Sequence, residues 1–233
     1  MFIKNINEID RQAWLKQTLT ALPQGARILD AGAGELKNRQ YCGHLDYVSQ
    51  DFCQYKGAGG GGAPDEGLQS HGWDTTRIDL VSDITAIPAP DASFDAILCS
   101  EVLEHVPEPT HALDELARLL KPGGVMILTA PFASNIHMAP YHYCSGFSKY
   151  WYEYHLAQRG FRIETLTANG DWYALLLQEI TRLGGLERQR CNWSWPFAYA
   201  YALLGLAYFK LRSNKRAEDL ACFGWQCVAV KKP

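Results

Sequence analysis

An acid followed by two glycines, Asp30, Gly32 and Gly34, is the stretch best suited to ligand chemistry. The apolar residues before Asp30 predict a short buried strand, and glycines two residues apart predict a tight turn where a ligand approaches bare backbone. An acid here would repel the pyrophosphate of a dinucleotide, but it can hold an ammonium group while backbone N–H groups hold a carboxylate. The stretch therefore predicts a site for a nucleoside that carries an amino acid.

Two further acids follow the next two predicted strands. Asp51 lies 19 residues after Gly32 (51 minus 32), an interval that in a βαβ unit places a carboxylate within reach of ribose hydroxyls. Asp83 offers an acceptor to an exocyclic amine, beside the apolar side chain of Ile84. Each acid taken alone is equally consistent with a solvated turn, so the prediction depends on their combination with the glycine turn.

Histidines could accept a proton from a substrate hydroxyl or amine near neutral pH, and the candidates are His105, His137, His142 and His155. His137 lies in the segment that would cover a second substrate, and it is the better candidate base. His105 could instead cap or pack a helix. Tyr143 could orient the second substrate, with aromatic packing as its alternative role. A carboxylate or thiolate substrate needs no base, and we assign no residue as a metal ligand.

Apolar runs alternate with helical segments along the chain, which predicts an α/β fold. The predicted strands are 28–30, 47–51, 77–81, 93–100, 125–129, 161–166 and 223–230, and the predicted helices are 9–22, 108–120, 147–159 and 171–183. Polar residues or glycines follow each of the first five strands. Ligands bind at that edge of an open α/β sheet, so one binding edge is predicted.

Composition narrows the classes of function. The 233 residues can bury a full core, and 22 basic against 25 acidic residues give a net charge of −3, which disfavours nucleic acid as a partner. The seven cysteines are odd in number and contain no C-x-x-C pair, so we expect reduced thiols. The N-terminus shows no export signal, and we expect a cytoplasmic protein.

Two stretches depart from an ordinary α/β pattern. Residues 53–76 are rich in glycine where a crossover helix is usual, and they predict either a flap over the nucleotide or a mobile excursion. Residues 191–209 carry no charge and many aromatic side chains. They predict a buried or substrate-covering helix, an interfacial helix on a lipid surface, or a dimer face.

Several motifs together resemble the class I S-adenosylmethionine-dependent methyltransferases of the type 11-like family. They are the segments 29–34, 82–84, 94–95, 101–105 and 120–124, together with Asp51. The resemblance implies a Rossmann-like three-layer sandwich whose seven-stranded, mostly parallel sheet has an antiparallel last strand. It also implies S-adenosylmethionine as the cofactor. Its methionine end would lie at Asp30, Gly32 and Gly34, its ribose at Asp51, its adenine at Asp83 and Ile84, and its sulfonium side near Glu101.

The predicted organisation is a single domain over 1–233, with an N-terminal helical segment (1–24), a glycine-rich insertion (53–76) and a helical insertion (171–215). A weaker resemblance, through 129–132, His137 and 140–143, favours a small-molecule, glycan or natural-product precursor methylated at oxygen or nitrogen. One alternative is an NAD(P)-dependent oxidoreductase, although Lys37 occupies the position of a third glycine. The other is a noncatalytic protein that binds the cofactor or acts as a scaffold.

Overall fold

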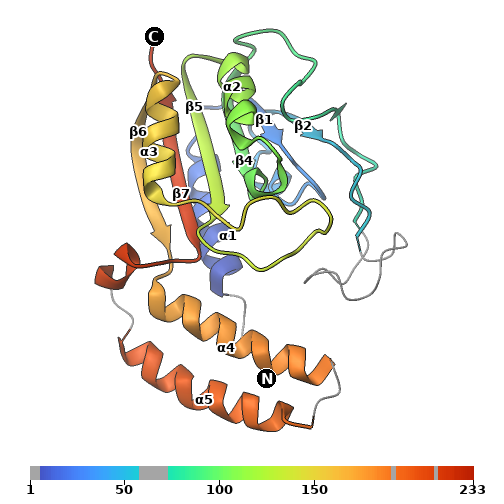
Figure 1. Cartoon of the computed structure of the whole chain (residues 1–233). Coiled ribbons are helices and arrows are strands. Elements are labelled where there is room, and N and C mark those ends of the chain that lie inside the picture. Colours follow the sequence, from blue (N-terminus) through green and yellow to red (C-terminus); the bar gives the residue numbers. More distant parts are fainter. Residues whose placement is uncertain (1–5, 58–72, 190–192, 213–214) are drawn as a thin grey trace. The chain divides into compact units, whose positions relative to one another are not determined.

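The computed structural model describes residues 6–57, 73–189, 193–212 and 215–233, and these form two compact units. The large unit contains Ala13–Thr167 and Trp225–Pro233, and the small unit contains Met1–Gln12 and Ala168–Gly224. Figure 1 draws the elements of both. The division into domains that the sequence suggests stays a prediction.

A seven-stranded, mostly parallel sheet with an antiparallel last strand forms the fold, as predicted, and its order is β3-β2-β1-β4-β5-β7-β6. The strands are β1 (Arg27–Ala31), β2 (Asp46–Asp51), β3 (Leu80–Val81), β4 (Phe94–Ser100), β5 (Leu120–Pro131), β6 (Phe161–Asn169) and β7 (Gly224–Lys231). Parallel pairing joins β3 to β2, β2 to β1, β1 to β4 and β4 to β5. The order reverses between β1 and β4, so the glycine turn after β1 lies at the switch point where α/β sheets bind ligands.

Helices cover both faces of this sheet and make the predicted three-layer sandwich (Figure 1). Helix α1 (Ile6–Thr20) places Leu15 and Leu19 in a buried cluster with Ile28, Leu98 and other strand residues. Helices α2 (Pro109–Leu119) and α3 (Lys149–Gln158) are drawn on the opposite side of the strands. Because β4 and β5 are covered on both faces, their central residues are almost all apolar.

Two strands differ in length from the prediction. Strand β3 contains only Leu80 and Val81, whereas β5 begins at Leu120, well before the predicted start. Leu120 pairs with Phe94, but the register then shifts before Val125 pairs with Ala96. The glycines that end helix α2 in sequence therefore lie in an irregular stretch of the strand, where Gly123 has a φ of +77°.

In the small unit, the aromatic, uncharged stretch 191–209 contributes most of helix α5 (Trp195–Arg212). This helix packs against α4 (Trp172–Gln189). Phe197, Tyr201 and Tyr208 are 67%, 63% and 55% exposed. This is not the exposure of a buried helix, so the expectation of burial is wrong for these side chains. The substrate-covering, lipid and dimer alternatives stay predictions. Among the described residues, no helix has the length and apolar character needed to cross a membrane.

The cysteines behave as expected where the structure describes them. The six described cysteines carry no disulfide, and Cys42, Cys99, Cys222 and Cys227 are buried. Burial raises the pKa of the Cys42 thiol to about 12. The buried thiols are therefore small apolar groups of the core rather than reactive ones. The remaining cysteine, Cys191, lies outside the described residues.

Candidate functional site

The glycine turn after β1 is held to the end of β2 by hydrogen bonds. The N–H groups of Gly32 and Ala33 donate to the Gln50 carbonyl at 2.8 and 2.9 Å. The N–H of Gly34 donates to Asp51 Oδ2 at 3.0 Å. The amides expected to hold a ligand carboxylate are thus already engaged with β2. They fix the shape of the turn rather than offering free donors to an anion.

Asp30 lies at the end of β1 and is 1% exposed. Tyr47 donates its hydroxyl to Asp30 Oδ2 at 2.6 Å. Burial raises the pKa of the Asp30 carboxyl to about 7, an effect that the Tyr47 hydrogen bond opposes and the nearby charge of Asp51 reinforces. A buried carboxylate of this kind is stabilised by a cation, which is the contact that the sequence assigned to it.

Asp51 ends β2, is 7% exposed and accepts one hydrogen bond on each oxygen. Oδ2 accepts from Gly34, and Oδ1 accepts from the Cys53 amide at 2.8 Å. A carboxylate oxygen can accept more than one hydrogen bond, so both atoms keep capacity for a diol. Phe52, the next residue, lies 5.0 Å ring to ring from Tyr141, which brings the segment after β5 to the end of β2.

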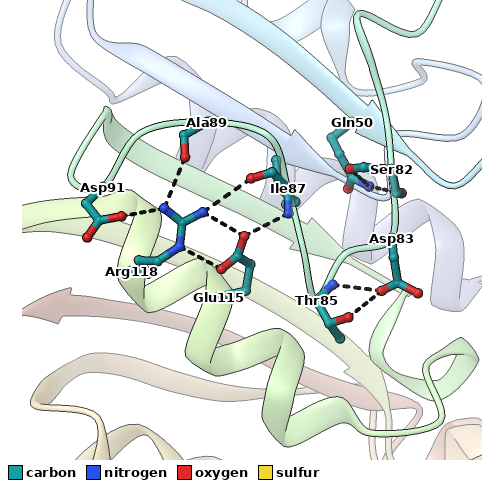
Figure 2. A network of polar contacts seen from close by, with 9 residues as sticks. All are labelled: Gln50, Ser82, Asp83, Thr85, Ile87, Ala89, Asp91, Glu115 and Arg118. Carbon is teal, nitrogen blue, oxygen red and sulfur yellow. Dashed lines mark hydrogen bonds and ion pairs between the residues drawn. The ribbon is translucent and has the colours of Figure 1, made fainter.

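Asp83 and Ile84 follow β3 on a segment that is tied to β2. Gln50 Nε2 donates to the Ser82 carbonyl at 2.7 Å, and the Ser82 amide donates to the Asp51 carbonyl at 3.1 Å. Asp83 Oδ1 accepts from the amide and hydroxyl of Thr85, as Figure 2 shows. Asp83 is exposed, whereas Ile84 is buried at 7% exposure. The structure therefore brings this pair to the same edge as Asp51.

Arg118 of helix α2 anchors the rest of that segment (Figure 2). Its guanidinium donates to the carbonyls of Ala89 and Ile87 at 3.0 and 3.2 Å, and it pairs with Glu115 at 2.7 Å. Glu115 in turn accepts from the Ile87 amide at 2.7 Å. The Arg118 hydrogen bonds lower the pKa of Glu115. This network holds in place the connection that carries Asp83 and Ile84.

Glu101 follows β4 and has a φ of +56°, an uncommon value for a residue with a side chain. The Thr129 hydroxyl donates to Glu101 Oε1 at 3.0 Å, and the Glu101 amide donates to the Thr129 carbonyl at 2.9 Å. Backbone strain of this kind concentrates at functional sites. Glu101 thus lies where β4 and β5 end together, and its place near a sulfonium stays a prediction.

Three histidines from two different segments form one group, which we call the histidine cluster: His105, His137 and His142. One ring nitrogen from each lies within 4.8 Å of the others. The ring centroids of His105 and His137 are 4.6 Å apart, and those of His137 and His142 are 4.9 Å apart. His105 follows β4 and the other two follow β5, and because these strands are parallel neighbours their ends meet.

The cluster surrounds a buried acid, Glu104, which is 1% exposed. Its Oε1 lies 3.7 Å from His105 Nε2 and 3.9 Å from His137 Nε2. His105 Nδ1 lies 2.6 Å from the Tyr141 carbonyl, and His137 Nδ1 lies 2.9 Å from the Asn135 carbonyl. Burial, together with the neighbouring His137, lowers the pKa of His105 to about 4, so this ring is neutral near pH 7.

The other predicted catalytic residues lie around or away from this cluster. The Tyr143 amide donates to the Glu104 carbonyl at 2.9 Å, but the Tyr143 side chain is 50% exposed. His155 lies on α3 with its ring 4.8 Å from that of Trp151. The structure therefore gathers His105 and His137, holds only the backbone of Tyr143 beside them, and leaves His155 outside.

The sequence reasoning missed three contributors to this site. Gln50 and Tyr47 position the glycine turn and Asp30, and Glu104 lies among the histidines. The available signal for Glu104 was its place beside His105, followed by two histidines five residues apart after the next strand. The central part of the glycine-rich insertion lies outside the described residues. At its end, Trp73 lies within 2.8 Å of the point where a Cβ on Gly34 would be.

The strand order and the acids at the strand ends define a Rossmann-like α/β protein with one binding edge. Residues 66–128 match the family described as "Methyltransferase domain". The chain is 38% identical over 113 residues to a ubiquinone biosynthesis O-methyltransferase of Xylella fastidiosa (strain M23), covering 45% of this chain and 42% of that protein. It is 35% identical over 122 residues to a demethylmenaquinone methyltransferase of Clavibacter sepedonicus, covering 50% and 46%. The matches span less than half the length of these curated relatives.

Solved structures share the fold over nearly the whole chain. The [4+2]-cyclase SpnF superposes with a TM-score of 0.58 at 21% identity, covering 96% of this chain and 80% of that one. Phosphoethanolamine N-methyltransferase 2 of Haemonchus contortus, in complex with S-adenosyl-L-methionine, superposes with a TM-score of 0.55 at 16% identity, covering 96% and 52%. Residues 66–128 therefore match a methyltransferase domain, and the chain as a whole shares the fold of these solved structures.

Proposed function

We propose that the protein transfers a methyl group from S-adenosylmethionine to an oxygen or nitrogen of a small molecule. The observation that carries this proposal is the buried Asp30 carboxylate beside the glycine turn, with Asp51 at the neighbouring strand end. Asp30 would bind the ammonium group of the cofactor, because a cation stabilises the charged form of a carboxyl whose pKa burial has raised. Gly32 and Gly34 would allow the amino-acid end to approach the backbone.

The remaining cofactor contacts follow from the chemistry of the other side chains. Both oxygens of Asp51 keep capacity to accept from the two ribose hydroxyls. Asp83 has one oxygen engaged by Thr85, which leaves Oδ2 for the exocyclic amine of adenine, with Ile84 as the apolar neighbour. Glu101 would lie near the sulfonium. Bound S-adenosylmethionine supplies an electrophilic methyl group.

The acceptor would lie beside the histidine cluster, where the segment after β5 reaches the ends of β2 and β4. Methyl transfer needs the donor and acceptor held in contact, and for a hydroxyl or amine it also needs a path for the released proton. His137 carries a free Nε2 lone pair if its Nδ1 donates to the Asn135 carbonyl, and His105 is arranged in the same way. Tyr143 would contribute to orienting the acceptor.

The curated relatives favour oxygen as the methylated atom, because one is named an O-methyltransferase of ubiquinone biosynthesis. A glycan or natural-product precursor with a hydroxyl group would meet the same chemical requirement. The same fold also occurs in SpnF, a protein named for a different reaction, a [4+2] cyclisation. A noncatalytic cofactor-binding protein is therefore the alternative that the experiment has to separate.

Isothermal titration with S-adenosylmethionine and, separately, NADH tests the cofactor. We expect binding of the first and none of the second; the reverse would favour an oxidoreductase. A metabolite extract incubated with radiolabelled methyl donor then tests transfer. We expect a labelled small molecule that is absent when Asp30→Asn protein is used. Cofactor binding without label in any acceptor pool, including phenols, amines and sugars, would favour the noncatalytic alternative.

A further inference from the structure

The hydrogen bonds of the histidine cluster fix where its lone pairs point. A backbone carbonyl only accepts, so Nδ1 of His105 carries the hydrogen that faces the Tyr141 carbonyl. The same reasoning puts a hydrogen on Nδ1 of His137, facing the Asn135 carbonyl. In neutral rings the Nε2 atoms then carry the lone pairs. Both of these atoms face the same carboxylate oxygen of Glu104, at 3.7 and 3.9 Å.

The third ring has no such support. Both ring nitrogens of His142 are buried, and neither has a hydrogen-bond partner among the described residues. A buried polar group without a partner is costly and needs an explanation. Electron-pair donors that converge in a buried space repel one another unless a positive charge lies between them.

We propose that His105, His137 and His142 bind a divalent transition-metal ion, with Glu104 Oε1 as a fourth ligand. The ligand nitrogens already lie within 4.8 Å of one another. Zinc holds imidazole nitrogens at about 2.0–2.1 Å, so tetrahedral ligand atoms lie about 3.4 Å apart. Binding would therefore require side-chain rotations that bring the most widely separated nitrogens about 1.4 Å closer together. This site departs from the sequence analysis, which assigned no metal ligand.

The supporting contacts are those that metal-binding histidines usually make. A ligating ring typically donates its other N–H to a carbonyl or carboxylate, which fixes its tautomer and orientation. His105 and His137 both donate Nδ1–H to backbone carbonyls, and His105 is only 8% exposed. Three imidazoles and one carboxylate suit zinc and neighbouring transition ions, whereas magnesium prefers all-oxygen sites. We therefore take Zn²⁺ as the probe.

A metal ion at this site would also bind the methyl acceptor, and this part of the inference rests on the proposed function. An acceptor hydroxyl that joined the four protein ligands as a fifth ligand of the ion would be more acidic and would release its proton to solvent. Its oxygen lone pair forms the new C–O bond as the methyl–sulfur bond breaks, and that electron pair stays on sulfur as a neutral thioether. His137 then acts as a ligand instead of as the base.

The binding test uses tag-free protein that a chelator has stripped of metal. Titration with Zn²⁺ against a chromophoric chelator is expected to give one ion per chain, and substitution with Co²⁺ is expected to give visible absorption bands of a nitrogen-ligated site. His137→Gln and His142→Gln are each expected to weaken Zn²⁺ binding at least about tenfold. His155→Gln is the matched control, because that ring lies on α3 outside the cluster. Circular dichroism checks that each variant folds.

The proposal fails if stripped protein takes up no stoichiometric Zn²⁺, or if His137→Gln and His155→Gln bind it equally. It also fails if Mg²⁺ but not Zn²⁺ occupies the site, or if the metal-free protein transfers methyl groups at full rate. Calorimetry with S-adenosylmethionine on the stripped protein keeps the two proposals separate. Zinc binding without cofactor binding would remove the methyltransferase proposal and leave the metal site standing.

Discussion

Val102 fills the space in which a side chain on Gly32 would have to lie. A Cβ built on Gly32 would come within 2.4 and 2.7 Å of the two Val102 methyl carbons. Gly32 also has a φ of +76°, a conformation that residues with side chains rarely adopt. Two requirements thus meet at this glycine, one of backbone conformation and one of space. This close contact links the glycine turn to Val102, which precedes the segment that carries Glu104 and His105.

Replacing Gly32 should reveal both requirements. Gly32→Ala is expected to lower the free energy of unfolding by about 2–4 kcal/mol, from backbone strain plus overpacking against Val102. Gly123→Ala is the matched control, because Gly123 has a φ of +77° with nothing within 4 Å of its added Cβ. It should cost only the strain, about 1 kcal/mol. Urea unfolding measures both, and equal losses would show that Val102 does not restrict the position.

A second variant isolates the steric part. Adding Val102→Ala to Gly32→Ala removes the two methyl groups but keeps the Val102 Cβ position, which lies 3.1 Å from the added atom. The double variant should therefore recover part of the stability that Gly32→Ala loses, measured against Val102→Ala alone. Strictly additive losses in this cycle would contradict a direct clash.

The pH dependence of stability should carry the signature of Asp30. Its pKa is about 7 in the folded protein against an ordinary value of 3.8. The unfolded chain ionises first, so folding stability is highest at low pH and falls as the pH rises from about 4 to about 7. The loss from this group is at most about 4 kcal/mol.

Asp30→Asn should remove that slope, leaving only the contributions of other groups. Unfolding free energies measured at intervals between pH 4 and 8 give the comparison, with Asp46→Asn as an exposed control on β2. Cofactor affinity should show the opposite trend and rise with pH up to about 7, because an ionised Asp30 binds an ammonium group. A cofactor affinity that does not change over this pH range would contradict the proposal that Asp30 binds the ammonium group.

Asp51 and Asp30 should be distinguishable by the part of the cofactor that each binds. Asp51→Asn is expected to weaken S-adenosylmethionine binding by about ten- to a hundredfold, since a charge-assisted hydrogen bond contributes roughly 1.5–3 kcal/mol. It should weaken 5′-methylthioadenosine, which keeps the ribose but lacks the amino acid, by a similar factor. Asp30→Asn should weaken only the first of these ligands. Calorimetry with both ligands provides the measurement, and equal effects of both variants on both ligands would contradict the assignment.

The Arg118 network should stabilise the connection that carries Asp83. Arg118→Met keeps the aliphatic stem but removes the donors to Ala89 and Ile87, and it should cost about 1–3 kcal/mol. Lys121→Met is the control, because its ion pair with Asp95 is about 40% exposed on both sides and should contribute under about 1 kcal/mol. Thermal unfolding at neutral pH compares them. Similar losses in both variants would place the Arg118 network among ordinary surface ion pairs.

Acid should reduce the contribution of the same network. The folded pKa of Glu115 is lower than its ordinary value, chiefly because Arg118 hydrogen-bonds to it. Its stabilisation is therefore present above the unfolded pKa and is lost as the pH falls through the folded one. The difference in stability between Arg118→Met and the unsubstituted protein should narrow as the pH falls below the ordinary glutamate pKa of 4.5. A difference that stays constant into acid would mean that the neutral hydrogen bonds carry the whole effect.

The position of the strand-end acids at one edge of the sheet could be predicted from the sequence, whereas the histidine cluster could not. Asp30 and Asp51 end apolar runs, and strand periodicity alone places such residues at the binding edge. The meeting of His105 with His137 depends instead on the loop between β5 and α3, whose path is fixed by bonds such as Tyr143 N–H to the Glu104 carbonyl. No local periodicity encodes a contact of that kind. The same reason hid the role of Glu104.

His137 is expected to matter for turnover and not for cofactor binding. His137→Ala should lower kcat by at least about a hundredfold, because it removes either a general base or a ligand of the ion that binds the acceptor. Affinity for S-adenosylmethionine should stay within about twofold, since the proposed cofactor contacts lie on β1, β2 and the segment after β3. His155→Ala should change neither quantity.

The two roles of His137 can then be separated by pH and metal. If His137 is the base, the rate of His137→Ala should recover at high pH in the absence of metal, because hydroxide can accept the proton. If His137 is a metal ligand, a higher Zn²⁺ concentration at constant pH should restore part of the rate of His137→Ala. The remaining His105, His142 and Glu104 still offer three ligands. If His137→Ala has the same rate as the unsubstituted protein under both conditions, His137 only packs against its neighbours. The acceptor would then release its proton to solvent.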